Sequence, residues 1–346
     1  MSEALDIQSN EKQSPSVNGG SGTGALQPPQ MGIWQRRLTV VSLCLTLFLG
    51  ALDITIIATA LPSISNQLRI TSAEYPWIGS GYTLAMTTST AIWVKLSDVF
   101  GRKPTIITGV SVFMVGNLVS ALAKSSVPLL AGRVVQGLGA GGSMILVSII
   151  IGDLFPLAER PKYYGLIGSA FGMASGLGPV LGGVFTEAIG WRWCCKLNYI
   201  LNYNEIWISN TDISTVYINL PFDGIALFLF YLNLKLSTEK GPILDGLAKL
   251  DWIGFLLIIG GKICLLYGLE SGSSRLSDWG SASVICLLVF GILILAFFLF
   301  WEAKFARRPL IPIRIFKQRT CFASFVVGYL HAFAFTSFDF FLPLYY

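Results

Sequence analysis

The sequence contains little charge and few of the side chains that build catalytic or metal sites. Only 12% of its 346 residues are charged, whereas soluble domains carry about 25%. The single histidine, His331, excludes a metal site made of several histidines. The six cysteines show no paired spacing of the kind that indicates disulfides or zinc. We therefore expect no metal, no cofactor and no enzyme activity, since a membrane-embedded enzyme needs clustered catalytic groups.

Long apolar runs take the place of the missing charge. Hydrophobic residues make up 53% of the chain, and a run of about 20 apolar residues has the length of a membrane-spanning helix. We predict an all-α membrane protein with nine such helices, over residues 38–62, 77–94, 105–123, 128–150, 163–188, 218–236, 252–269, 281–301 and 320–346.

The distribution of basic residues predicts the orientation of these helices. With a cytoplasmic N-terminus, 17 of the 24 Lys and Arg residues fall in cytoplasmic segments and 5 in outer loops, while only Arg133 and Lys262 lie inside spans. Cytoplasmic loops of membrane proteins carry the excess of Lys and Arg. The net charge of +5 is therefore a sign of topology, and we expect no nucleic-acid partner.

Two charges inside apolar spans indicate a functional site. Asp53 lies in the first span, in LDITIIATALP, and Arg133 lies in the fourth, in LLAGRVVQGLGAGG, with Gln136 nearly one turn later. A charge at the centre of a membrane helix costs about 2.5–3.5 kcal/mol on insertion scales and needs a partner. At 1.5 Å per residue, Asp53 lies about 13 Å and Arg133 about 8 Å from the outer ends of their helices. We predict that they pair, directly or through Gln136 or water, either as a switch released by protonation of Asp53 or as a purely structural ion pair.

The turn between the second and third spans, VKLSDVFGRKPT, concentrates charge. Asp98 precedes Gly101, and Arg102 and Lys103 follow it. Such a turn can lock two helices together in one conformational state. The alternative is that its basic residues only hold the topology.

The fifth span has glycines at a spacing of four, followed by a Gly-Pro pair. Glycines at this spacing share one helical face and let another helix approach closely. The Gly-Pro pair interrupts the backbone hydrogen bonds and bends the helix. The pattern suits a helix that packs closely and rocks; it consists of Gly168, Gly172, Gly176, Gly178, Pro179, Gly182 and Gly183.

Together these stretches resemble the major facilitator superfamily. The charged turn is similar to the family's loop signature G-x-L-a-D-r-x-G-R-K, and the fourth span is similar to R-x-x-q-G-x-g. GSAFGMASGLGPVLGG in the fifth span is similar to the signature of proton-coupled drug antiporters, while LDITIIATALP and WIGSGYTL resemble the fourteen-span drug:proton antiporters, notably those of fungi. The resemblance runs from about residue 39 to the last residue. Val94 departs from the pattern, which usually has glycine there.

The resemblance implies an alternating-access carrier that exports small amphipathic molecules, such as drugs, toxins or secondary metabolites, by proton antiport. The proton gradient is then the energy source. It implies that Asp53 and Arg133 couple the proton and that the motif of the fifth span sets the direction of exchange. An uptake carrier, such as a siderophore–iron porter, is the alternative among transporters. A non-transporting membrane protein is a further alternative, but it has no need of Asp53 and Arg133 at matched depth.

The resemblance also implies where substrate and partners bind. We expect the first, second, fourth and fifth spans to line the substrate cavity, with Gln136, Thr55, Thr83 and Thr87 among its polar residues. The expected partners are a small-molecule substrate, protons and the lipid bilayer, and the expected state is a monomer. We expect the plasma membrane, with the vacuolar membrane as the alternative.

The same resemblance implies how the chain is organised. After a disordered cytoplasmic tail (1–37), rich in Ser, Gly, Pro and Gln, residues 38–236 form a six-helix transporter half. A cytoplasmic loop (237–251), two additional spans (252–301), a basic cytoplasmic segment (302–319) and the first helix of a second half (320–346) follow. A carrier of this type binds its substrate between two halves. We therefore interpret the chain as truncated and expect it to be inactive alone.

Residues 195–216 interrupt the resemblance on the outer side, where the family suggests WRWCFYINLP. We interpret this stretch as a retained intron, because Cys-Lys codons can contain a donor GTAAG and Thr-Val codons an acceptor CAG. An outer loop or interfacial segment is the alternative. Two carboxylates also have no counterpart in the family pattern: Asp339 is a candidate second titrating site, and Asp223 fits equally well as a charge tolerated near the outer interface.

Overall fold

The computed structural model describes residues 32–72, 74–184, 219–234, 251–273, 279–305, 310 and 313–341. Within them the regular structure is helical, which confirms the all-α prediction. The helices are α1 (Ile33–Leu68), α2 (Tyr75–Phe100), α3 (Arg102–Ala121), α4 (Ser126–Leu154), α5 (Arg160–Val184), α6 (Asn219–Asn233), α8 (Trp252–Ser273), α9 (Ala282–Lys304), the short 3-10 helix η4 (Ile313–Lys317) and α10 (Arg319–Phe341).

Six of these helices, α1, α3, α4, α5, α8 and α9, are long and apolar enough to cross a membrane. The α2 helix falls outside this group because its many Ser, Thr and Gly residues lower its apolar character, and α6 has only 15 described residues. Each α-helix coincides with one predicted span, but α1 starts at Ile33, inside the predicted tail. The predicted insert (195–216) lies outside the described residues, as does nearly all of the predicted loop 237–251.

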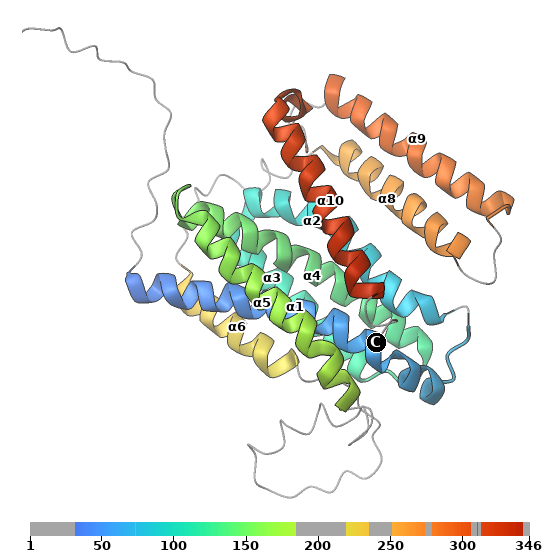
Figure 1. The fold of residues 1–346 in the computed structure, drawn as a ribbon, viewed down its shortest axis with the longest axis horizontal. Helices are drawn as coiled ribbons and strands as arrows, with labels where there is room; N and C mark the ends of the chain where they lie inside the picture. The colour runs from blue at the N-terminus through green and yellow to red at the C-terminus, as the bar shows by residue number, and fades with distance from the viewer. Residues whose placement is uncertain are drawn as a thin grey trace, which may run out of the picture.

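The first six helices form one bundle around α4, whose two faces pack against α2 and α3 (Figure 1). The α1 helix packs against α5 and α6 and closes the other side of the bundle. The largest apolar cluster joins α1, α3, α4, α5 and α6; it includes Leu43, Val110, Leu146, Ile150 and Phe230, all at most 1% exposed. Packing of this kind drives helix association in a bilayer, where the hydrophobic effect between helices is absent.

Glycines on α3 and α4 bring these two backbones into direct contact. A Cβ at Gly139 would overlap the backbone of Phe113, and a Cβ at Gly116 would overlap the backbone of Gln136. On the opposite face of α4, a Cβ at Gly137 would overlap the carbonyl oxygen of Tyr82 in α2. The close approach of α2, α3 and α4 therefore depends on the absence of side chains at these positions.

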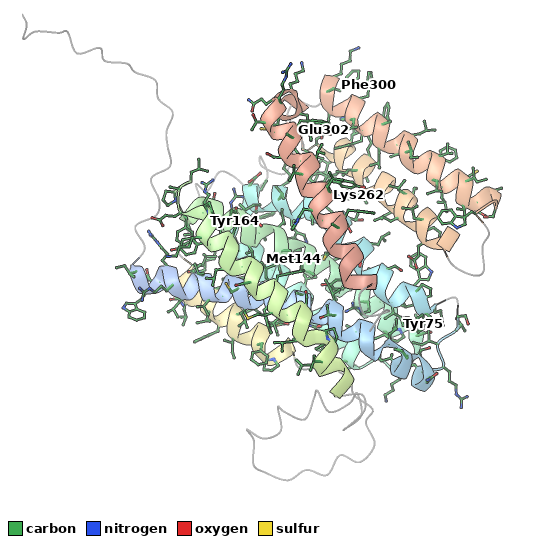
Figure 2. The ribbon with its side chains drawn as sticks, in the orientation of Figure 1. Tyr75, Met144, Tyr164, Lys262, Phe300 and Glu302 are labelled. Carbon is green, nitrogen blue, oxygen red and sulfur yellow. The ribbon has the colours of Figure 1, made fainter. Side chains whose placement is uncertain are left out.

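The α8 and α9 helices form a hairpin beside the bundle, and α8 contacts α2 (Figures 1 and 2). The Lys262 Nζ donates a hydrogen bond of 3.0 Å to the carbonyl oxygen of Thr87, and the rings of Trp77 and Tyr267 lie 4.9 Å apart. Large apolar side chains cover the outer face of α9, for example Phe290, which is 59% exposed. Such a surface suits a lipid environment.

The glycine contacts predict which substitutions in α4 destabilise the bundle. Gly139→Ala should lower the thermal unfolding temperature of the purified chain in detergent, because overpacking against the Phe113 backbone costs about 1–3 kcal/mol. Gly152→Ala, in the same helix, is the matched control: no atom of the described residues lies within 4 Å of its added Cβ, and alanine favours a helix by up to about 1 kcal/mol over glycine. Equal unfolding temperatures for the two variants, measured by circular dichroism, would contradict the packing described here.

Candidate functional site

The predicted ion pair lies at the centre of the bundle. The Arg133 Nη1 of α4 donates to Asp53 Oδ2 of α1 at 2.5 Å, and each side chain is 2% exposed. The same guanidinium donates from Nε to the carbonyl oxygen of Ile78 at 3.2 Å and lies 4.3 Å from the centre of the Tyr82 ring, both in α2. Arg133 therefore contacts two neighbouring helices. The predicted pairing with Asp53 is confirmed, and it is direct.

Gln136 extends this pair by one residue. Its Oε1 accepts from Arg133 Nη1 at 2.8 Å, and its Nε2 donates to Asp53 Oδ1 at 2.9 Å. Both carboxylate oxygens of Asp53 are thus hydrogen-bonded by residues of α4. The Gln136 Nε2 also donates to Asn117 Oδ1 of α3, at the place where Gly116 lets α3 approach α4. The family resemblance implies that Gln136 lines the substrate cavity. In this structure Gln136 is fully buried within the charged cluster.

A second carboxylate joins the cluster from α6. Asn117 Nδ2 donates to Asp223 Oδ2 at 3.2 Å, and Asp223 is only 1% exposed. The side chain of Asp223 is therefore enclosed by the helices of the bundle. We refer to Arg133, Asp53, Gln136, Asn117 and Asp223 as the buried polar cluster; its residues come from α1, α3, α4 and α6.

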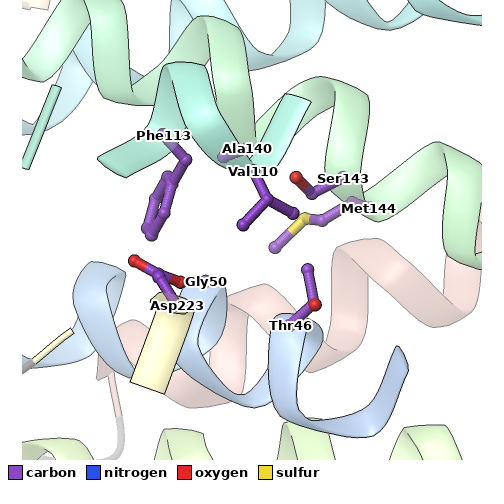
Figure 3. Close-up of a pocket in the computed structure, with 8 residues that line it drawn as sticks. All are labelled: Thr46, Gly50, Val110, Phe113, Ala140, Ser143, Met144 and Asp223. Atoms are coloured by element: carbon purple, nitrogen blue, oxygen red, sulfur yellow. The ribbon is translucent and has the colours of Figure 1, made fainter. Parts of the chain in front are cut away.

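A small cavity adjoins the cluster at Asp223 (Figure 3). Its volume is about 10 Å³, room for about one water molecule. It is lined by Thr46 and Gly50 of α1, by Val110 and Phe113 of α3, by Ala140, Ser143 and Met144 of α4, and by Asp223. The hydroxyl groups of Thr46 and Ser143 donate to carbonyl oxygens of their own helices, and each oxygen can still accept a hydrogen bond.

The predicted charged turn joins four helices, α2, α3, α4 and α6, at one end of the bundle. Gly101 has a φ of 94° and forms the sharp junction between α2 and α3, a conformation that favours glycine. Arg102 pairs with Asp98 of α2 at 2.6 Å and with Asp153 of α4 at 2.9 Å. Lys103 reaches α6, where its Nζ donates to the carbonyl oxygen of Tyr231 at 2.7 Å.

The glycine motif of α5 lies in two environments. A Cβ at Gly178 would overlap the Thr55 side chain, so this glycine sets the contact between α5 and α1. The face predicted for close helix contact is open: Gly168, Gly172 and Gly176 have no described atom within 4 Å of an added Cβ. The contact with α1 instead uses Ala174 together with Gly178, on another face. Pro179 lies within the helix, and no side-chain environment is described for Gly182 and Gly183.

The threonines predicted to line a cavity do not converge in this conformation. Thr55 is held between α1 and α5 against Gly178 and donates to the carbonyl oxygens of Ala51 and Leu52. Thr83 and Thr87 are exposed on α2, and their hydroxyls bond to their own helix.

Sequence reasoning missed Asn117, Asp153 and the position of Asp223. A polar side chain inside an apolar span is a signal in itself, and Asn117 and Asp223 both carry it. The helical faces on which they lie depend on the packing of α3 against α4 and α6, which no pattern in one helix reveals. The predicted second titrating site at Asp339 lies in α10, where its side chain is outside the described residues.

The chain is similar to one large family of transporters. A family model described as Major Facilitator Superfamily matches residues 43–202. The efflux pump dotC of Dothistroma septosporum is 44% identical over 309 residues, which are 89% of this chain and 49% of that protein. The MFS-type transporter ppz2 of Metarhizium majus is 41% identical over the same shares. The efflux pump FUS6 of Gibberella fujikuroi is 33% identical over 89% of this chain and 52% of that protein. The chain thus spans about half the length of the curated relatives it matches.

The Asp53–Arg133 and Asp98–Arg102 ion pairs should differ in energy, because the first is buried and the second is exposed. Removal of one partner of a buried pair costs about 3–5 kcal/mol, whereas exposed pairs contribute about 0.2–1 kcal/mol. We expect Asp53→Asn and Arg133→Gln each to lower the free energy of unfolding strongly, and the double variant to lose clearly less than the sum of the two. The matched cycle, Asp98→Asn with Arg102→Gln, should show coupling of no more than about 1 kcal/mol. Denaturation of the four single and two double variants in detergent measures both couplings, and equal values would contradict the distinction.

Proposed function

The chain belongs to the major facilitator superfamily, and we propose that the protein exports small amphipathic molecules by proton antiport with alternating access. It is a multi-pass membrane protein, since six of its described helices have the length and apolarity of membrane spans. Because the chain spans about half the length of its curated relatives, the proposal concerns the activity of the whole protein.

The observation that carries the proposal is the burial of Asp53 and Arg133 between helices. Ionisable side chains inside a membrane protein face the interior, pair with one another and commonly mark proton pathways. A proton on Asp53 neutralises its carboxylate and weakens the charge-assisted hydrogen bond with Arg133. Since Asp53 lies on α1 and Arg133 on α4, one proton changes the contact between two helices of the bundle. That is the physical requirement for coupling a proton to a conformational change.

The charged turn supplies a separate contact that conformational change must break. Arg102 holds α2 and α4 together through Asp98 and Asp153, with the arginine side chain 25% exposed. Exposed pairs of this kind are weak individually and exchange readily with water. We propose that the turn stabilises one conformation and opens in the other. A turn that only held the topology has no need of Asp153 on a different helix.

The proposed direction is export. Gly178, the first residue of the Gly178-Pro179 pair of α5, lies in direct contact with Thr55 of α1. Thr55 is two residues after Asp53. A bend at this position is a means of moving α1 and α5 relative to each other. The names of dotC and FUS6 as efflux pumps support the same direction.

The remaining expectations stand as proposals. The substrate is a small amphipathic molecule; Gln136, Thr55, Thr83 and Thr87 line its cavity in a conformation other than the present one. The energy source is the proton gradient, without a cofactor. The N-terminus faces the cytoplasm, and the protein acts as a monomer in the plasma membrane.

Two alternatives predict different outcomes in one transport assay. For an exporter, cells that express the protein should accumulate less of a fluorescent amphipathic dye than control cells, and an uncoupler of the proton gradient should abolish the difference. An uptake carrier would raise accumulation of its substrate, for example a ferric siderophore. A non-transporting membrane protein would change neither.

The role of Asp53 is tested in the same assay. Asp53→Asn keeps the size of the side chain but cannot lose or bind the coupled proton, so we expect export against a gradient to fall at least tenfold at equal expression. Glu159→Gln is the control, because Glu159 is an exposed carboxylate outside the buried polar cluster, and it should export normally. Wild-type export by Asp53→Asn would refute the coupling role while leaving transport itself intact.

A further inference from the structure

The buried polar cluster holds two carboxylates but one cation. Counted over whole residues, Asp53, Asp223 and Arg133 are exposed by 3%, 1% and 1%. Burial of a charge is unfavourable unless it is paired. With both carboxylates ionised the cluster would carry one uncompensated negative charge, and with one proton it is neutral.

The hydrogen bonds assign that proton to Asp223. Both oxygens of Asp53 accept from Arg133 and Gln136, and one of these bonds comes from a cation. Within the described residues, Asp223 accepts one hydrogen bond, from the neutral amide of Asn117. Asp223 Oδ2 is the acceptor, which leaves Oδ1 available to carry a proton, and the residue also lines the cavity. The geometry therefore favours an ionised Asp53 and a neutral Asp223.

The groups facing Asp223 from the neighbouring helices agree with this assignment. Asp53 on α1 is a second carboxyl group, and Arg133 on α4 is already paired with it. Tyr82 on α2 is a neutral phenol whose ring lies against Arg133, and α3 contributes only the amide of Asn117. Among the described residues, no second cation of these helices lies at Asp223.

A cavity with room for about one water molecule adjoins the carboxyl group that carries this proton. It lies beside Asp223 and is flanked by the hydroxyls of Thr46 and Ser143 (Figure 3). One water molecule in this space could accept from the protonated carboxyl and donate to either hydroxyl.

We propose that Asp223 is a second proton-binding residue, linked through Asn117 and Gln136 to the Asp53–Arg133 pair, and that the two carboxylates share one proton. In the conformation seen here the proton is on Asp223 and Asp53 is ionised. Transfer of a proton from Asp223 to Asp53 leaves the charge of the cluster unchanged at zero. Protonation of Asp53 alone, in a cluster with no second carboxylate, would leave Arg133 as an uncompensated buried cation. The inference deepens the proposed proton antiport, and its role in transport rests on that function.

Infrared spectroscopy of the purified chain in detergent tests the assignment without any transport. At neutral pH we expect one carbonyl band of a protonated carboxylic acid that exchanges slowly with deuterium. Asp223→Glu should shift this band and Asp223→Asn should remove it. Asp53→Glu is the matched control and should leave the band in place. Absence of the band from the unmodified chain, or a shift with Asp53→Glu in place of Asp223→Glu, would overturn the assignment.

Sharing of the proton is tested by Asp53→Asn. Arg133 then has Asp223 as its nearest remaining carboxylate, so Asp223 should ionise and the band should disappear at the same pH. Persistence of the band in this variant would show that the carboxylates are not coupled. If the Asp223 variants do not fold, isotopic labelling of aspartate in the unmodified chain assigns the band to this residue type, and Asp53→Asn still tests the coupling.

The outcomes separate this inference from the proposed function. A band assigned to Asp223, together with efflux that does not respond to the proton gradient, overturns the proposed antiport but not the protonation of Asp223. Proton-driven efflux that keeps its pH profile in Asp223→Asn overturns the role of Asp223 in coupling and leaves the antiport standing.

Discussion

The burial of Arg133 is the constraint on which the rest of the bundle depends. A guanidinium without water needs a counter-charge and acceptors for its N–H groups, and these come from Asp53 on α1, Gln136 on α4 and the Ile78 carbonyl on α2. Three helices must therefore meet at one depth, and the glycines of α3 and α4 make this approach possible. The site and the packing are two aspects of one requirement, because neither the charges nor the bare helix faces would be stable without the other.

The sequence predicts how deep each charged residue lies within its span, because depth depends only on the number of residues from the end of the helix. Asp53 and Arg133 can be placed at similar depth from their distances to the ends of their spans, and two opposite charges in an apolar environment have few other partners. The positions of Asn117 and Asp223 could not be predicted, because depth does not reveal on which face of a helix a residue lies. The stripe Gly168, Gly172 and Gly176 illustrates the same limit: the spacing identifies a face bare of side chains, yet α1 packs on a different face of α5, next to Gly178.

The two charged sites of the bundle are suited to different tasks by their exposure. The Arg102 contacts with Asp98 and Asp153 lie where water reaches them, so they are screened and weak, and their loss is tolerable in each cycle. The Asp53–Arg133 pair is shielded from water, so its electrostatic energy is large and responds to a single proton. A carrier needs both properties: a lock that opens at low cost, and a buried pair whose energy depends strongly on protonation.

The same shielding sets a condition on the buried pair. A carboxylate that neutralises an arginine cannot simply accept a proton, since the arginine then stays charged in a site without water. A second carboxylate within the same hydrogen-bonded cluster removes this difficulty, because the compensating charge is retained when the proton changes place. Asp223 on α6 meets that condition through Asn117 and Gln136, and it lines the small cavity in the bundle. On this reasoning the cluster as a whole, and not Asp53 by itself, is the unit that binds the proton, and helix α6 belongs to the coupling machinery together with α1 and α4.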